Sequence, residues 1–191
     1  MFETLISKLQ EDKYLTLETT PQHEPSMHNI VEKIKKFKIN SKVDGFTCTD
    51  NPLAKLKYNS LFAALKLQQE FKKPVIATMT MRDRNKIALQ SDLLGANDFD
   101  IRAILALTGD PANMSDQPNS KGVFEANSLM LLKMIKSFNY GMDFAGRPFK
   151  IEPKQIFPFA VVNAYAKNFG SLEKKMHLKI QNGAVGVITQ P

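Results

Sequence analysis

Short apolar runs alternate along the chain with longer segments in which apolar residues recur every three or four positions. Apolar runs bounded by glycine, proline or charged residues are typical of strands that are buried on both faces. Six runs of this kind predict strands at 14–17, 45–50, 75–81, 104–107, 156–162 and 185–190. Pro158 argues against a regular first half of the fifth strand, because proline cannot donate to a neighbouring strand.

The segments between the strands have the spacing of amphipathic helices. This spacing predicts helices at about 3–10, 28–37, 60–72, 86–96, 125–138 and 171–182. Gly95 is expected to close the helix at 86–96. Leu172, Met176 and Ile180 lie four residues apart and are expected to face the core. The glycine- and proline-rich stretch at 140–153 predicts a surface loop or hairpin.

Alternation of strand and helix predicts a parallel sheet with right-handed crossovers. A (β/α) barrel and an open doubly wound sheet both fit, but neither GxGxxG after a strand nor GxxxxGK[ST] is present to favour the open sheet. Every predicted strand ends in polar side chains, which is how barrel enzymes build a site. We therefore predict an α/β fold, a TIM (β/α)8-type barrel with about six of the eight βα units, forming one incomplete barrel domain over 1–191.

The number of strands is smaller than a closed barrel requires. A full barrel has eight strands and about 250 residues. An open six-stranded barrel would expose backbone edges and apolar side chains. We expect either a longer polypeptide or a second chain to complete the barrel, and residues 1–191 alone to aggregate or to depend on a partner.

Composition narrows the class of protein. The 191 residues carry a formal net charge of +7, which fits either solvated lysine-rich helix faces or attraction of anionic ligands such as nucleotides or polyglutamylated cofactors. We expect no nucleic-acid partner, because the basic residues form no dense block.

Cys48, the single cysteine, excludes an internal disulfide and is expected to be a small core residue. The sequence shows no signal peptide and no apolar run of about 18 residues, so we expect a cytoplasmic protein without a membrane partner.

Two strand ends suggest chemistry by themselves. Asp110 follows Gly109 at the carboxyl end of a buried strand, the edge at which parallel α/β proteins bind ligands, although it could also cap the following turn. The run Arg82 to Asn85 could bind phosphate or form a lattice of ion pairs. His23, His28 and His177 have no metal-ligand spacing, so we assign no metal.

Five strand-end motifs together resemble the methylenetetrahydrofolate reductase family. They are LETTP at 17–21, TCTDNP at 47–52, MRDRN at 81–85, LTGDP at 107–111, and GA at 183–184 followed by ITQP at 188–191. The resemblance implies a TIM barrel that binds FAD at the carboxyl ends of its strands. It also implies reduction of 5,10-methylenetetrahydrofolate to 5-methyltetrahydrofolate with NADH or NADPH, in one-carbon and methionine metabolism, by a homo-oligomer.

The same resemblance assigns the catalytic carboxylates. Glu18 matches the proposed proton donor, which would help to open the imidazolidine ring of the substrate if an apolar surround raised its pKa; by itself it could be a helix-cap or ion-pair carboxylate. Asp110 matches an aspartate that lies near the flavin and contacts the pterin. Gln190 matches a folate-contacting glutamine, whose amide can both donate to and accept from the pterin.

The remaining matches concern FAD. Thr49 matches a hydroxyl contact, and Lys179 matches a lysine that reaches the cofactor, although it could also be a solvated helix lysine. Glu125 and Asn163 fall at cofactor-contacting positions but differ in type from the best-known bacterial members. The set of expected FAD contacts is completed by Thr78, Thr108, Gly109 and Asp110. Thr78 and Thr108 stand where those members often have histidine and arginine.

Two other functions stay open. A non-reductase relative would bind folate and pass one-carbon units to a corrinoid or other partner protein, and an interaction module would have no chemistry. Yellow protein that NADH bleaches would indicate the reductase, and folate binding without colour would indicate the relative.

Overall fold

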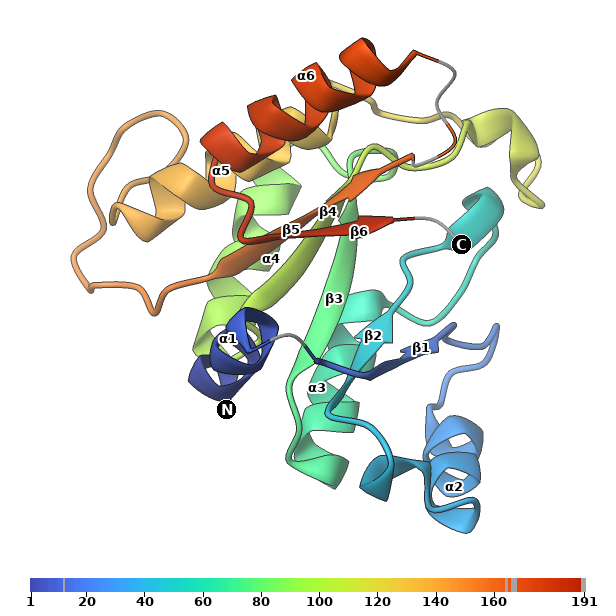
Figure 1. The fold of residues 1–191 in the computed structure, drawn as a ribbon. Helices are drawn as coiled ribbons and strands as arrows, with labels where there is room; N and C mark the ends of the chain where they lie inside the picture. Colours follow the sequence, from blue (N-terminus) through green and yellow to red (C-terminus); the bar gives the residue numbers. More distant parts are fainter. Residues whose placement is uncertain (12, 164, 166–167, 190–191) are drawn as a thin grey trace. The chain divides into compact units, whose positions relative to one another are not determined.

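A computed structural model describes residues 1–11, 13–163, 165 and 168–189. Figure 1 shows the strands and helices of these residues. The strands are β1 (Thr16–Thr19), β2 (Gly45–Cys48), β3 (Val75–Thr80), β4 (Ala103–Leu107), β5 (Phe157–Val162) and β6 (Gly186–Thr189). The helices are α1 (Phe2–Gln10), α2 (His28–Lys36), α3 (Ser60–Phe71), α4 (Lys86–Asp98), α5 (Ser128–Asn139) and α6 (Phe169–Gln181). Short 3-10 turns are η1 (Ile39–Ser41), η2 (Pro52–Ala54) and η3 (Ala112–Met114).

The strands have the sheet order β1-β2-β3-β4-β5-β6. The predicted α/β fold with a parallel sheet is therefore confirmed. The chain divides into two compact units, which we describe separately. The first comprises Met1–Met79 and Asp110–Lys121, and the second comprises Thr80–Gly109 and Gly122–Pro191.

The first unit is built on the parallel strands β1, β2 and, as far as Met79, β3, whose last residue Thr80 belongs to the second unit. Every residue of β2 and β3 is buried, as expected for strands covered on both faces. Helix α3 lies along β2 (Figure 1), and its Ser60 Oγ donates to the carbonyl of Thr78 at 2.7 Å. At the amino end of β2, Lys8 of α1 pairs with Asp44. These contacts join α3 to β3 and α1 to the residue that precedes β2.

The second unit is built on the parallel strands β4, β5 and β6. Helices α5 and α6 lie side by side over these strands (Figure 1), and α5 buries Leu131, Leu132 and Ile135. Pro158 lies inside β5 opposite Ile104, and its carbonyl accepts from Val185 N at 2.8 Å. The first half of β5 is thus regular despite the proline.

Several boundaries differ from the sequence prediction by one to three residues. Those of β1 and α5 differ because strand pairing and a capping side chain override the local pattern. Strand β1 begins and ends two residues later than expected, since it pairs with β2 from Thr16 to Thr19, so Glu18 lies within the strand rather than after it. Helix α5 begins at Ser128, three residues late, because Asn127 Oδ1 accepts from Leu129 N at 3.0 Å.

Two helix predictions were wrong. Gly95 does not close α4, which continues to Asp98. A Cβ at position 95 would meet no atom within 4 Å. A glycine inside a helix lowers its stability by about 1 kcal/mol relative to alanine, which does not end the helix here. Helix α6 buries none of its residues, and Ile180 is 48% exposed, so the apolar stripe is covered less than its spacing predicts. No helix in the described ranges is long and apolar enough to cross a membrane.

Cys48 is a fully buried free thiol in β2, as expected for a core residue. Burial raises the pKa of this thiol from 9.0 to about 12, although a contact with the Thr19 hydroxyl partly opposes the shift. We expect a disulfide reagent at pH 8 to modify native Cys48 at least about 10³-fold more slowly than an exposed cysteine, since the thiolate is the reactive form. Unfolding in urea should restore the ordinary rate. Complete labelling of the native protein within seconds would contradict this prediction.

Candidate functional site

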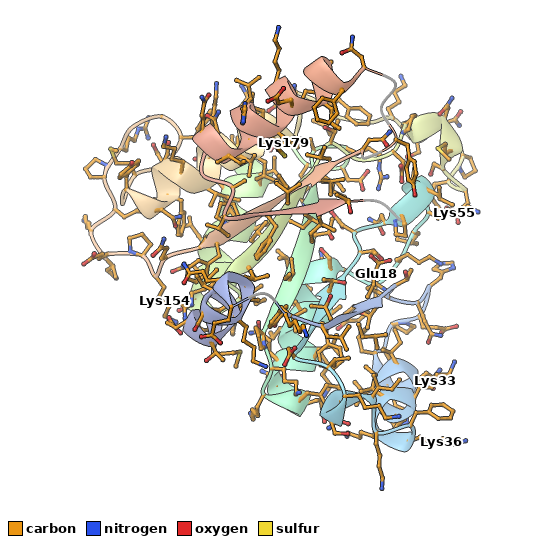
Figure 2. All side chains as sticks on the ribbon, in the orientation of Figure 1. Glu18, Lys33, Lys36, Lys55, Lys154 and Lys179 are labelled. Atoms are coloured by element: carbon orange, nitrogen blue, oxygen red, sulfur yellow. The ribbon has the colours of Figure 1, made fainter. Side chains whose placement is uncertain are left out.

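Three of the predicted site residues lie at the carboxyl end of the strands in the first unit. Glu18 is exposed on β1 (Figure 2), opposite Thr47 of β2. Thr49 and Thr78 each come one residue after the paired Cys48 and Ala77. The backbone N–H of Thr49 donates to the carbonyl of Thr19 at 3.1 Å, which continues the pairing of β1 and β2 to this edge.

The two threonines of this edge differ in what they offer a ligand. Thr49 Oγ1 is buried and has no hydrogen-bond partner within the described part of the chain. A buried hydroxyl without a partner costs free energy, and a ligand atom that pairs with it recovers that cost. Thr78 is 4% exposed inside β3, and its carbonyl already accepts from Ser60. Thr49 is therefore the threonine of the pair whose buried hydroxyl lacks a partner in the described structure.

Asp110 belongs to the same unit. Its Oδ2 accepts from Leu53 N at 2.6 Å, a short charge-assisted hydrogen bond. The side chain is half-buried, and Oδ1 has no hydrogen-bond partner among the residues that the structure describes. Asp110 thus holds the segment after β2 with one oxygen and leaves the other available to a ligand.

Gly109, in the second unit, occupies a position whose backbone conformation and close neighbours require glycine. Its φ is +98°, a conformation that side chains rarely adopt. A Cβ at this position would lie 3.0 Å from Arg82 Cβ and 3.2 Å from Thr80 Cβ. The glycine therefore permits the close approach of the chain after β4 to the end of β3.

The hydroxyl of Thr108 has a capping role. Thr108 Oγ1 accepts from Ser128 N at 3.2 Å, at the first residue of α5. This bond satisfies one of the backbone donors that a helix start leaves unpaired. The threonine thus stabilises α5, which is a role that the family resemblance does not imply.

Glu125 and Asn163 also make structural contacts. Glu125 Oε2 accepts from Lys86 N at 2.9 Å, at the positive end of the α4 dipole. Asn163 follows β5, and its Oδ1 accepts from Tyr165 N at 2.9 Å in a local turn. Both side chains are exposed, so neither is built into the core of its unit.

Lys179 connects α6 to β5. It is half-buried on α6 (Figure 2), and its Nζ donates to the carbonyl of Val161. Burial is the main cause that lowers the pKa of Lys179 below its ordinary value, and the charge of Lys175 adds to it. The structure therefore excludes the alternative of a freely solvated helix lysine.

The run that follows β3 forms the ion pairs considered for it. Arg82 is 2% exposed, and its Nε and Nη2 donate to the two carboxylate oxygens of Asp83 at 2.7 and 2.6 Å. Arg84 Nε lies 2.8 Å from Asp92 Oδ2, and Asn85 caps α4 through Ala88 N. This arrangement favours the ion-pair interpretation over phosphate binding.

The sequence did not predict the contact between Leu53 and Asp110. The donor is the backbone N–H of Leu53, and every residue except proline has such a donor, so the residue type does not indicate the contact. Gln190 lies outside the described residues. Within the described ranges, no group of three or more His, Cys, Asp or Glu side chains is placed to hold a metal ion.

Comparison with known families decides the identity of the chain. The family model described as methylenetetrahydrofolate reductase matches residues 3–191, nearly the whole sequence. The chain belongs to the methylenetetrahydrofolate reductase family. No curated protein matches the chain.

Membership in this family sets the class of chemistry. It places the chain among folate-related one-carbon reductases, an oxidoreductase family whose fold is the TIM barrel and which is generally flavin-dependent. The six parallel strands are consistent with part of such a barrel.

Proposed function

We propose that the chain carries the catalytic site of a cytoplasmic enzyme that reduces 5,10-methylenetetrahydrofolate to 5-methyltetrahydrofolate with NADH or NADPH. FAD, when bound, would accept hydride from the nicotinamide and deliver it to the folate. The family match over residues 3–191 supports the proposal. The observation that carries it in this structure is the buried Thr49 hydroxyl at the carboxyl edge of the strands, which has no hydrogen-bond partner among the residues described.

The residues present fit a flavin cofactor. The Thr49 hydroxyl has a hydrogen-bonding capacity that none of the described residues uses. Lys179 is a cation held in place by its bond to the Val161 carbonyl and suits an anionic ligand. We propose Thr49, Thr78 and Asp110 in the first unit as FAD contacts, and Thr108, Gly109, Glu125, Asn163 and Lys179 in the second.

The folate contacts are Asp110 and Gln190. The Oδ1 of Asp110, which has no partner in the described part of the chain, would accept from the amino-pyrimidine edge of the pterin, which presents N–H donors. The amide of Gln190 would both donate to and accept from the same ring system. Together they would orient the pterin for hydride transfer, which needs the reacting atoms at close range.

Glu18 is the proposed proton donor. Opening of the imidazolidine ring leaves electron density on a nitrogen, and a carboxylic acid beside that nitrogen can protonate it. The Glu18 side chain is exposed in residues 1–191, so the apolar surround that a general acid needs would come from bound ligands or from the part expected to complete the barrel.

The decisive experiment is visible absorbance of the purified intact protein. We expect yellow protein whose flavin band is bleached by NADH or NADPH without oxygen and restored by 5,10-methylenetetrahydrofolate. Protein that purifies without flavin and gains none from added FAD contradicts the proposal. Folate binding without colour would favour the non-reductase relative.

Replacement of Thr49 tests the cofactor contact separately. Thr49→Val keeps the shape of the side chain and removes only the hydroxyl. We expect FAD affinity to fall about 3- to 10-fold, the value of one hydrogen bond, while the stability of the FAD-free protein stays equal or rises. The measurements are FAD titration and urea unfolding.

Thr19→Val is the matched control for this test. Its hydroxyl is buried but satisfied, since it donates to the Thr47 carbonyl at 2.7 Å. We expect this variant to lose about 1 kcal/mol of stability and to keep its FAD affinity. Equal behaviour of the two variants would show that Thr49 makes no contact with FAD.

A further inference from the structure

The segment that follows β2 has an unfavourable backbone conformation. Asn51, Leu53 and Ala54 have φ values of +44°, +56° and +56°. Asparagine tolerates this left-handed region, but leucine and alanine adopt it at a cost in free energy. Such a conformation persists only where the surroundings hold it.

Apolar packing holds only part of this segment. Ala54 is buried at 8% exposure, but Leu53 and Leu56 are 48% and 47% exposed, so neither leucine side chain is anchored in the core. Hydrogen bonds to backbone N–H groups hold the segment as well. Asn51 Oδ1 accepts from Lys57 N at 2.8 Å within the segment. From the segment that follows β4, Asp110 Oδ2 accepts from Leu53 N at 2.6 Å and Asp116 Oδ1 from Leu56 N at 3.4 Å.

The bond from Leu53 to Asp110 is the strongest of the three contacts by geometry. It is the shortest, its acceptor is ionised, and its donor belongs to a residue in the left-handed region. The bond to Asp116 is at the long limit for a hydrogen bond. Of these three hydrogen bonds, the one to Asp110 is therefore the strongest restraint on the strained segment.

We propose that Asp110 is a positioning residue that latches residues 51–57 in their strained conformation. Its other carboxylate oxygen stays available, so a ligand can bind Oδ1 without breaking the bond to Leu53. A ligand on Oδ1 fixes the carboxylate and makes opening of the segment rarer. Since coupling between two events is reciprocal, the closed segment also favours the ligand.

The latch predicts a measurable difference in the free protein. In amide hydrogen exchange, Asp110→Ala should speed exchange over residues 51–57 by roughly tenfold or more, because the restraint on a strained backbone is lost. Amides of β2 and β3 should keep their protection, which shows that the variant is folded. Asp116→Ala is the matched control, because it removes a carboxylate from the same segment but a much weaker bond; we expect a change of less than about threefold.

A second variant tests the strain itself. Glycine adopts positive φ without the cost that leucine has. In the Asp110→Ala background, Leu53→Gly should therefore lower the excess exchange of the segment. Exchange over 51–57 that is the same in Asp110→Ala as in the unchanged protein overturns the latch.

The coupling to ligand rests on the proposed function and has its own test. With tetrahydrofolate as the probe, exchange over 51–57 should slow further, by roughly threefold or more, in the unchanged protein but not in Asp110→Ala. Binding of tetrahydrofolate without this slowing overturns the coupling. Absence of tetrahydrofolate binding contradicts the proposed function instead, and the free-protein comparison then decides the latch alone.

Discussion

Glu18→Gln should lower the rate of folate reduction by at least about 10²-fold and leave flavin reduction by NADH nearly unchanged. Loss of a general acid costs about 10²- to 10⁴-fold in the step that needs the proton. Opening of the folate ring needs that proton, whereas transfer of hydride from the nicotinamide does not. Stopped-flow absorbance of the flavin in the intact protein measures the two half-reactions separately.

Asp110→Asn supplies the comparison for this prediction. It removes a charge from a residue proposed to lie beside both the flavin and the pterin, so it should weaken folate binding and alter both half-reactions. Asparagine keeps an acceptor oxygen for Leu53 N, so the effect reports the charge more than the fold. If Glu18→Gln slows both steps equally, or neither, Glu18 is a structural carboxylate of β1 rather than the proton donor.

Gly109→Ala should have the largest effect on stability. The new Cβ meets Arg82 Cβ at 3.0 Å and Thr80 Cβ at 3.2 Å, and it sits on a backbone with φ of +98°. Neither neighbour is the end of a flexible side chain, so the backbone after β4 must shift. We expect the free energy of unfolding to fall by about 1–3 kcal/mol beyond the cost of the conformation alone, the usual penalty of overpacking. Urea unfolding measures this difference.

Gly146→Ala is the matched control, because it has the conformation without the contact. Its φ is +84°, and nothing lies within 4 Å of the added Cβ. This variant should lose only the smaller cost of a left-handed alanine. Equal losses at positions 109 and 146 would show that the close approach to β3 is unimportant.

The sequence by itself determined the order of elements and the family. The apolar runs at 75–81 and 104–107 predict β3 and β4 closely, because a strand buried on both faces needs an unbroken run of apolar residues. The strand-end motifs predict the family correctly, because ligand contacts of this fold lie in the short segments after its strands. These are local properties that a stretch of five to seven residues records.

Tertiary structure decided the positions that depend on a partner distant in sequence. Pairing with β2 moved β1 so that Glu18 lies within the strand, and the Asn127 side chain set the start of α5. The apolar stripe of α6 does not state how deeply its residues are covered, which is why Ile180 was expected in the core and is exposed. Periodicity gives the face of a helix but not the surface that packs on it.

The roles of the candidate site residues show the same division. Residue type and position alone could not distinguish Thr49, whose buried hydroxyl has no partner in the described structure, from Thr108, whose hydroxyl caps α5. The hydrogen bond between Leu53 and Asp110 joins residues that are 57 positions apart, and its donor is a backbone N–H. The side chain of Leu53 therefore gives no indication of this bond. The sequence predicted which polar residues follow the strands, and only the folded chain decided which of their groups are already engaged, because a hydrogen bond depends on distance and direction in space.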